Sequence, residues 1–199
     1  VISTQSVHDV RAFCARMLAV PEANVSVTMR DVGGGFGSKM LIGREEAATV
    51  LAAHRLGATV KWIEDRRENL ISAPHSRNES AALRVAVDDD GTIQAITAES
   101  QCDLGAYPAA GGPMDSQLLP GPYKIPRLGF SMEMTWSNTM GKGPYRGPWM
   151  FETTAREMMI DIVARRIGMD PAELRRRNIL RATDLPFTSP GLKEFQEIT

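Results

Sequence analysis

Residues 31–40 read DVGGGFGSKM, and the rest of the chain is organised around this stretch. Four of the five positions from Gly33 to Gly37 are glycine, which permits positive φ angles and lets the backbone approach a ligand without a Cβ in the way. Backbone amides presented in this way can point at an anion or a polar cofactor. A tight turn is the alternative interpretation. Because the stretch lies between a predicted strand and a predicted helix, we interpret it as a binding loop.

Two phosphate-binding templates fail on this loop. In a P-loop a second glycine stands five residues after the first and is followed by Lys-Ser or Lys-Thr. Counted from Gly33, those positions hold Ser38, Lys39 and Met40, and methionine has no hydroxyl for magnesium. The dinucleotide fingerprint Gly-x-Gly-x-x-Gly fits Gly33 and Gly35, but Ser38 stands at its third glycine. The loop therefore indicates neither a nucleoside triphosphate nor a complete Rossmann site.

The composition is that of a globular chain of 199 residues, 43% hydrophobic and 24% charged. Its 23 basic and 24 acidic residues indicate no nucleic-acid surface and favour small-molecule or protein partners. Cys14 and Cys102 are the only cysteines and form no CxxC pair, and the sequence has no membrane-length apolar run and no signal-like start. We expect a cytoplasmic setting, no membrane insertion, and either a single domain over residues 1–199 or two small, closely packed lobes.

The side chains show no metal-ligand spacing. His8, His54 and His75 each lack a second histidine or cysteine at the spacing of a metal site. The run Asp-Asp-Asp-Gly at 88–91 could suggest calcium, but it lacks the alternating oxygen ligands and the final glutamate of an EF-hand. We interpret it as a hairpin turn.

Three elements are expected around the glycine loop. Ser6 is placed to cap a helix over residues 7–18, with Asp9 as the acid of a capping box. Alternating apolar residues predict a strand over 25–30 that leads into the loop. An alanine-rich helix over 45–56 follows it. Its start is expected to face the loop, so that its free amides add to the anion-binding character.

The middle of the chain is rich in predicted strands. A short strand is expected over 59–63, and alternation predicts longer strands over 77–87, 93–103 and 128–136. Residues 105–126, rich in glycine and proline, are expected to form a long irregular connection. The pattern as a whole indicates an α+β fold, with mixed sheets and flanking helices.

A second glycine-rich and proline-rich stretch, GKGPYRGPW, occupies residues 141–149 at the entry to a predicted helix over 151–167. Arg146 within it has a restricted backbone and five fixed hydrogen-bond donors, which suits a binding role. The alternative is a surface arginine in a turn. The apolar face of the helix is expected to consist of Ala155, Met158, Met159, Ile162, Val163 and Ile167.

Six motifs occur in order along the chain: STQ at 3–5, MLAVP at 17–21, GGGFGSK at 33–39, YKIP at 123–126, YRG at 145–147 and GMDPAELRRRN at 168–178. Through them the chain resembles the molybdenum-cofactor-binding subunit of the xanthine dehydrogenase, aldehyde oxidase and aerobic carbon monoxide dehydrogenase family. The resemblance covers nearly the whole chain. It implies that these residues are one lobe of the cofactor-binding domain, within a longer subunit.

The resemblance also implies a function. In this family a large subunit holds molybdenum-molybdopterin, expected here in its dinucleotide form, and hydroxylates a substrate with water as the oxygen source. Electrons leave through [2Fe-2S] clusters to FAD in partner subunits or domains. By motif, the cofactor-binding residues are Gly34, Gly35, Phe36, Gly37, Arg146 and Gly147. Arg146 is the catalytic candidate beside the metal, which no side chain ligates. The family's general base is a glutamate in a later segment, so the fragment alone should be inactive.

Departures from the family pattern bear on the substrate. The substrate pocket is expected to include Met40, Pro148 and Trp149. Met40 replaces the glutamate of purine-oxidising members and residues 105–123 contain no arginine, so an aldehyde or aromatic heterocycle is expected in place of a purine. Gly147 stands where carbon monoxide dehydrogenases carry a copper-bridging cysteine. The alternatives are a carbon monoxide dehydrogenase-like subunit, a non-catalytic structural or assembly module, and a nucleotide-binding regulatory domain.

Overall fold

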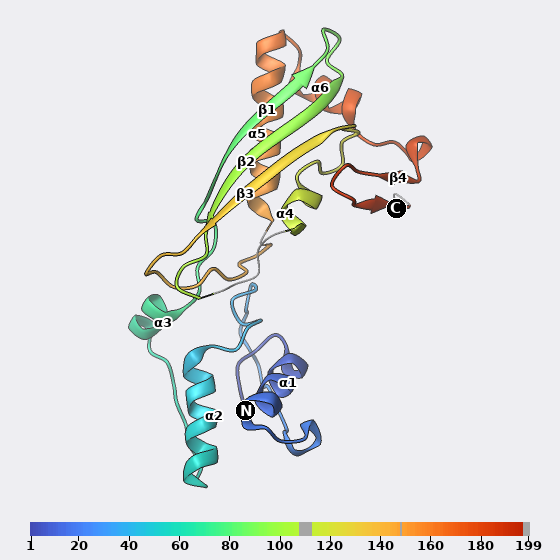
Figure 1. The fold of residues 1–199 in the computed structure, drawn as a ribbon. Coiled ribbons are helices and arrows are strands. Elements are labelled where there is room, and N and C mark those ends of the chain that lie inside the picture. The colour runs from blue at the N-terminus through green and yellow to red at the C-terminus, as the bar shows by residue number, and fades with distance from the viewer. Residues whose placement is uncertain (108–112, 148, 197–199) are drawn as a thin grey trace. The chain divides into compact units, whose positions relative to one another are not determined.

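The computed structural model describes residues 1–107, 113–147 and 149–196 (Figure 1). The chain divides into two compact units. Unit 1 comprises Val1–Ser76 and Met140–Gly147, and unit 2 comprises Arg77–Thr139 and Pro148–Thr199. Helices and a mixed sheet are both present, which confirms the predicted α+β class. Within the described ranges, none of the helices combines the length and the apolar character needed to cross a bilayer.

Unit 2 is built on a three-stranded sheet in the order β1-β2-β3. Strands β1 (Glu79–Val87) and β2 (Ile93–Asp103) pair antiparallel, and β3 (Leu128–Thr135) runs parallel to β2. The turn between β1 and β2 closes through a hydrogen bond from the Gly91 amide to the Asp88 carbonyl, with Gly91 at a φ of 89°. The bounds of β1, β2 and β3 lie within two residues of the strands predicted over 77–87, 93–103 and 128–136, so these predictions are confirmed.

Helices and a second small sheet complete unit 2. Helix α5 (Met150–Ile167) lies against the three-stranded sheet, and α6 (Pro171–Asn178) packs on α5 (Figure 1). The connection predicted to be irregular contains a short helix, α4 (Pro113–Leu118). A 3-10 turn, η2, spans Ala182–Asp184, and β4 (Phe187–Thr188) pairs with β5 (Glu194–Phe195). The buried core contains Ile93, Ile96, Ala98, Leu119, Tyr123, Ile125, Met159, Ile160, Ala164 and Leu174.

The buried face of α5 differs from the predicted one. Met158 is 61% exposed and Ile162 is 43% exposed, whereas Glu152 and Arg156 are buried. The Arg156 side chain donates to the Leu118 and Leu119 carbonyls and to Glu157. Hydrophobic periodicity could not predict this, because a buried arginine becomes stable only when distant carbonyls satisfy its donors.

Unit 1 is helical: it contains α1 (Val7–Leu18), the 3-10 turn η1 (Glu22–Asn24), α2 (Arg44–Leu56) and α3 (Arg66–Ser72). The predicted bounds of α1 are confirmed, and α2 begins one residue earlier than predicted. The predicted capping box of α1 is wrong, because Ser6 donates its hydroxyl to the Asp9 carboxylate and accepts no bond from the helix amides.

Two predicted strands of unit 1 are not formed. Residues 25–30 and 59–63 have no strand ladder, although Val25 has the extended angles φ −112° and ψ 124°. The first segment receives a single backbone bond near its centre, from the Ile2 amide to the Thr28 carbonyl. An alternating pattern produces a strand only where a neighbouring backbone supplies the ladder. In the described part of the chain neither segment has such a neighbour.

Candidate functional site

The glycine loop and the second glycine-rich stretch meet in unit 1. The Arg146 amide donates to the Phe36 carbonyl at 2.5 Å, and the Arg146 guanidinium carbon lies 6.0 Å from the centroid of the Phe36 ring. The two candidate segments, far apart in the sequence, are therefore in direct contact. This contact places the predicted residues Phe36, Gly37, Arg146 and Gly147 next to one another.

Both residues of the contact hold an unusual backbone conformation. Phe36 has a φ of 51° and Arg146 a φ of 47°, and each is followed by a glycine with positive φ. The left-handed region costs a residue with a Cβ roughly 1–2 kcal/mol. Such strained residues persist where the surrounding structure fixes them, and they concentrate at binding and catalytic sites. The strain supports a binding role for this contact over an ordinary surface turn.

The glycines allow the close approach of other parts of the unit. A Cβ on Gly37 would lie 2.9 Å from the Pro144 carbonyl oxygen, and a Cβ on Gly35 would lie 2.3 Å from Oε1 of Gln5. No side chain fits at either position without displacing a neighbour. Gly35 and Gly37 therefore serve the packing of the loop, in addition to any ligand that the loop holds.

Gln5 is a site residue that we did not single out from the sequence. The side-chain oxygen Oε1 of Gln5 accepts a hydrogen bond from the Gly37 backbone amide at 2.9 Å. The backbone amide of Gln5 donates to the Lys39 carbonyl, also at 2.9 Å. The Gly37 amide, expected to face the cofactor, thus donates to Gln5 in this structure. The sequence did contain a signal for Gln5, because this residue is the last of the STQ motif at 3–5, one of the six motifs that carry the family resemblance.

Neighbouring groups hold the far end of the loop. Lys39 donates from Nζ to the Ser3 hydroxyl and the Val32 carbonyl, and Thr4 donates from Oγ1 to the Lys39 carbonyl at 3.0 Å. The Ser38 hydroxyl donates to the Gly35 carbonyl at 2.7 Å. The polar side chains at the end of the loop are therefore used to shape it.

The start of α2 is partly occupied by a carboxylate of the helix itself. A carboxylate oxygen of Glu46 lies 2.2 Å from the point where a Cβ on Gly43, the N-cap residue, would stand. Burial raises the pKa of the Glu46 carboxyl, while hydrogen bonds from the amides of Glu46 and Gly43 act in the opposite direction. The Glu46 carboxylate therefore occupies the amides of Gly43 and Glu46 at the start of its own helix.

The predicted substrate-pocket residues do not fall within one unit of the described chain. Met40, at the end of the glycine loop, is 48% exposed and is followed by the exposed Leu41. Trp149 is 45% exposed and belongs to unit 2. Pro148 lies outside the described residues. Over the described ranges no group of three or more His, Cys, Asp or Glu side chains could hold a metal ion.

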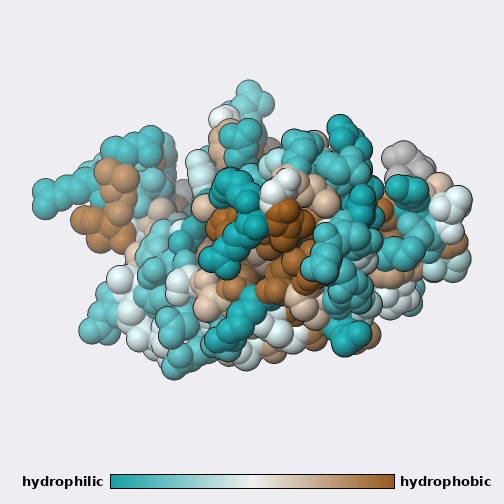
Figure 2. All heavy atoms as spheres, turned by 90° about the horizontal axis from the view of Figure 1, so that it is seen from above, coloured by the Kyte–Doolittle hydropathy of each residue, from teal (hydrophilic) through white to brown (hydrophobic). Residues whose placement is uncertain are grey.

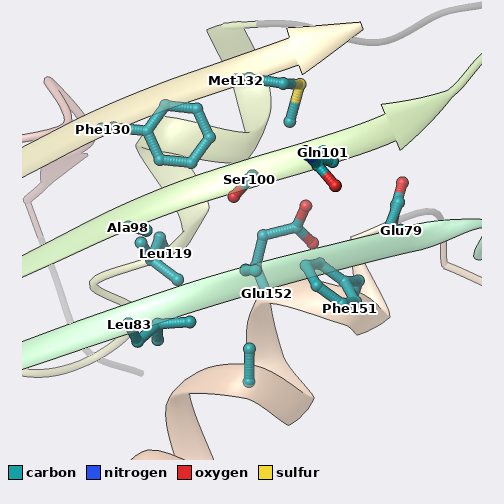
Figure 3. Close-up of a pocket in the computed structure, with 12 residues that line it drawn as sticks. Glu79, Leu83, Ala98, Ser100, Gln101, Leu119, Phe130, Met132, Phe151 and Glu152 are labelled. Atoms are coloured by element: carbon teal, nitrogen blue, oxygen red, sulfur yellow. The ribbon is translucent and has the colours of Figure 1, made fainter. Parts of the chain in front are cut away.

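Unit 2 contains a small internal cavity that sequence reasoning did not find. It lies between the sheet and α5, and the Glu79 and Glu152 carboxylates, together with Ser100, line it beside apolar residues (Figure 3). Its free volume, about 10 Å³, is that of roughly one water molecule. The cavity is too small for an organic substrate, so the candidate site remains the Phe36–Arg146 contact.

Comparison with known proteins shows the family to which the chain belongs. A family model described as the molybdopterin cofactor-binding domain matches residues 1–179. The chain is 38% identical to the 6-hydroxypseudooxynicotine dehydrogenase complex subunit gamma of Paenarthrobacter nicotinovorans, over 95% of this chain and 24% of that protein. It is 34% identical to the nicotine 6-hydroxylase large subunit of the same organism, over 98% of this chain and 25% of that protein.

Among solved structures, quinoline 2-oxidoreductase from Pseudomonas putida 86 matches with a TM-score of 0.91 and 35% identity, over 98% of this chain and 26% of that one. A Cu,Mo-containing CO dehydrogenase matches with a TM-score of 0.90 and 29% identity, over 97% and 25% of the two chains. The chain therefore belongs to the molybdopterin cofactor-binding domain family. It spans about a quarter of the length of the curated relatives that it matches.

Proposed function

We propose that this chain is part of the large, molybdopterin-binding subunit of a molybdenum hydroxylase. The observation that carries the proposal is the contact between Phe36 and Arg146, since it unites the two motifs in a strained arrangement within unit 1. In this proposal residues 1–199 form one lobe of the cofactor-binding domain, and the rest of the domain and the general base lie elsewhere in the subunit.

The groups at this contact suit a molybdopterin. Its oxo and phosphate oxygens are hydrogen-bond acceptors, and the loops supply donors: the exposed Arg146 guanidinium and the backbone amides of Gly34, Gly35 and Phe36. Gly37 and Gly147 bring the backbone close. These residues would hold the cofactor in its dinucleotide form. When bound, the cofactor supplies a two-electron oxidation that inserts oxygen from water into the substrate.

The chain's own residues would orient and enclose the reactants. Arg146 would present fixed donors to negative charge that develops beside the metal, which is most effective where water is excluded. Met40 and Trp149 would provide an apolar wall, together with Pro148. A neutral wall of this kind suits an aldehyde or an aromatic heterocycle, and the nicotine and quinoline enzymes among the relatives support the heterocycle.

The proposal includes partners. Two of the relatives are named as subunits of larger enzymes. By analogy, the electrons would pass to an iron–sulfur subunit with [2Fe-2S] clusters and then to an FAD subunit, in the cytoplasm. A carbon monoxide dehydrogenase-like activity is the second candidate, favoured by the match to the Cu,Mo enzyme and opposed by Gly147 at the position of the bridging cysteine. A non-catalytic structural or assembly module is the third.

The test is Arg146→Ala in the full-length subunit assembled with its partners. We expect turnover to fall by roughly 10²–10³-fold, the usual effect of removing a preorganised donor, with molybdenum still bound. Arg146→Lys should restore only part of the activity, because it keeps the charge and loses the planar fork.

Arg30→Ala, which removes an exposed arginine of unit 1, is the control and should leave turnover unchanged. Wild-type complex without molybdenum and without activity would overturn the enzyme proposal in favour of the assembly module. Unchanged turnover in Arg146→Ala would remove Arg146 from the site.

A further inference from the structure

Unit 2 carries an open apolar groove between the edge strand β1 and helix α5, with a volume of about 620 Å³. Its floor and walls are mostly aliphatic, for example Leu83 and Val85 from β1 and Met158 and Ile162 from α5. The groove is separate from the Phe36–Arg146 contact, which lies in unit 1. A groove of this size and lining is large enough for a row of side chains from another segment of polypeptide.

Along the groove, apolar residues of α5 are exposed, because no other described part of the chain covers them. Met158 is 61% exposed and Ile162 is 43% exposed, although helical periodicity assigns both to the apolar face. In Figure 2 brown apolar side chains likewise reach the surface among teal hydrophilic ones. Contiguous exposed apolar residues mark interaction surfaces more often than single ones do. The sheet therefore covers only part of the apolar face of α5, and Met158 and Ile162 lie on the uncovered part.

The strand beside the groove has an open hydrogen-bonding edge. β1 pairs only with β2 among the described strands. Because the Asp103 amide donates to the Asn78 carbonyl, the alternation of an antiparallel ladder turns the amides of Ala81, Leu83 and Val85 away from β2. The nine-residue strand contains no proline or lysine, the residues that commonly protect an edge. It is a template for one more strand.

We propose that a strand from the part of the large subunit outside these 199 residues adds to the free edge of β1 and places alternate apolar side chains in the groove. Strand addition satisfies the outward amides and fills the groove at the same time, since every second side chain of the added strand points to one face. The occupant is assigned to the same subunit because the relatives are about four times as long as this chain, which covers 24% of one and 25% of another.

The rim of the groove adds a chemical constraint. Arg84, which also pairs with Glu99, and Arg166 both border it, so an acidic residue in the added strand is favoured near them. The inference rests on the proposed function only in its choice of occupant: a segment of the same large subunit.

The experiment is hydrogen–deuterium exchange on the full-length large subunit, read at single residues of β1. The amides of Ala81, Leu83 and Val85 should exchange about 100-fold more slowly than open edge amides, at low protein concentration and without partner subunits. The inward amides of Ser80 and Ala82 pair with β2 and report that the sheet is folded.

Three variants separate strand addition from general stability. Met158→Lys places a charge in the groove and should abolish the protection of the outward amides, whereas Thr154→Lys places the same charge on an exposed position of α5 outside the groove and should not. Ala81→Pro removes one outward amide from a position where an edge strand tolerates proline, and should also abolish the protection at Leu83 and Val85. In all three variants the inward amides should remain protected.

Fast exchange of the outward amides in the wild-type subunit, with slow inward amides, would overturn the inference. Protection that grows with protein concentration would assign the groove to a second copy, and protection that requires added partner subunits would assign it to them; both results would also overturn it. Molybdenum is measured on the same samples. A subunit with protected outward amides, whose assembled complex holds no molybdenum and shows no activity, would refute the proposed function and leave the added strand intact.

Discussion

The two units differ in how well they bury their apolar side chains. Among its described residues, unit 2 has one cluster of ten buried apolar side chains around Ile96, Ile160 and Leu174. In unit 1 the buried apolar side chains among the described residues are Val10, Cys14 and Ala15, and helices α2 and α3 bury none. Yet the whole Phe36–Arg146 contact belongs to unit 1. The candidate cofactor site thus sits in the unit with the smaller core.

The two units therefore differ in what stabilises them. Unit 2 can stabilise itself by apolar burial, whereas unit 1 holds its loops mainly through polar bonds such as those of Gln5 and Lys39. Two left-handed residues, Phe36 and Arg146, add strain to the smaller core. A ligand that binds only the folded unit adds to its stability by mass action. We therefore expect unit 1 to depend on bound cofactor and on the rest of the subunit far more than unit 2 does.

The largest expected effect comes from making the same leucine-to-alanine change once in each unit. Leu174→Ala in unit 2 removes a side chain that is 0% exposed and should cost about 2–5 kcal/mol of unfolding free energy. Leu51→Ala on α2 of unit 1 removes a half-buried leucine and should cost about 1–2 kcal/mol, in proportion to the smaller buried area.

Urea unfolding followed by tryptophan fluorescence, with Trp62 reporting on unit 1 and Trp136 on unit 2, measures both costs. Leu174→Val is the milder control within unit 2. Equal costs for the two alanine variants would mean that apolar burial stabilises unit 1 as much as unit 2. This result would contradict the proposed difference between the two units.

The elements that the sequence predicted well have local signals. The start of α6 shows what such a signal is: Asp170 accepts from the Glu173 amide and Pro171 stands at the first helical position, both within the motif at 168–178. The hairpin turn at 88–91 was predicted, and so were the ends of α2 at Leu56 and of α5 at Ile167, each of which is followed by a glycine. In each case the residues that decide the structure are within a few positions of one another.

The features that were missed depend on groups distant in the sequence. The segment 25–30 has a strand pattern without a ladder, and α5 buries Arg156 because the Leu118 and Leu119 carbonyls accept its donors. Gln5 meets Gly37 only through the fold. For the site, motif resemblance predicted that Phe36 and Arg146 belong together, while their backbone angles and hydrogen bond came from the structure alone. Local propensity contains no information about such contacts.

A smaller effect on unfolding free energy is expected from the hydrogen bonds that join Tyr123, Arg156 and Arg175 to Glu157 in unit 2. The Tyr123 hydroxyl donates to the Glu157 carboxylate at 3.0 Å, and Glu157 also accepts from Arg156 and Arg175. Burial first, and then the bond to Glu157, raise the pKa of Tyr123 to about 12. A raised pKa contributes stability that is complete below the unfolded pKa, near 10, and is lost as the pH rises through 12.

Tyr123→Phe should therefore cost about 1 kcal/mol at neutral pH and should remove part of the stability loss between pH 10 and 12. Melting temperatures of the two proteins across that range measure it. Tyr107→Phe, at a 46% exposed position in unit 2, is the control. Coincident pH curves for wild type and Tyr123→Phe would show that the Tyr123 hydroxyl contributes nothing to the stability of unit 2.

The smallest expected effect is in α3 of unit 1. Asp65 accepts from the Glu68 amide and Glu68 accepts from the Asp65 amide, both at 2.8 Å, which forms a complete capping box. Asp65→Ala should cost about 1 kcal/mol of helix stability, and Asp65→Asn, which keeps an acceptor, should cost less. Because α3 buries no residue, the loss should speed amide exchange within α3 and leave global melting unchanged. If global melting falls by as much as the helix is weakened, α3 unfolds together with the rest of unit 1. The unit would then be more cooperative than its sparse core implies.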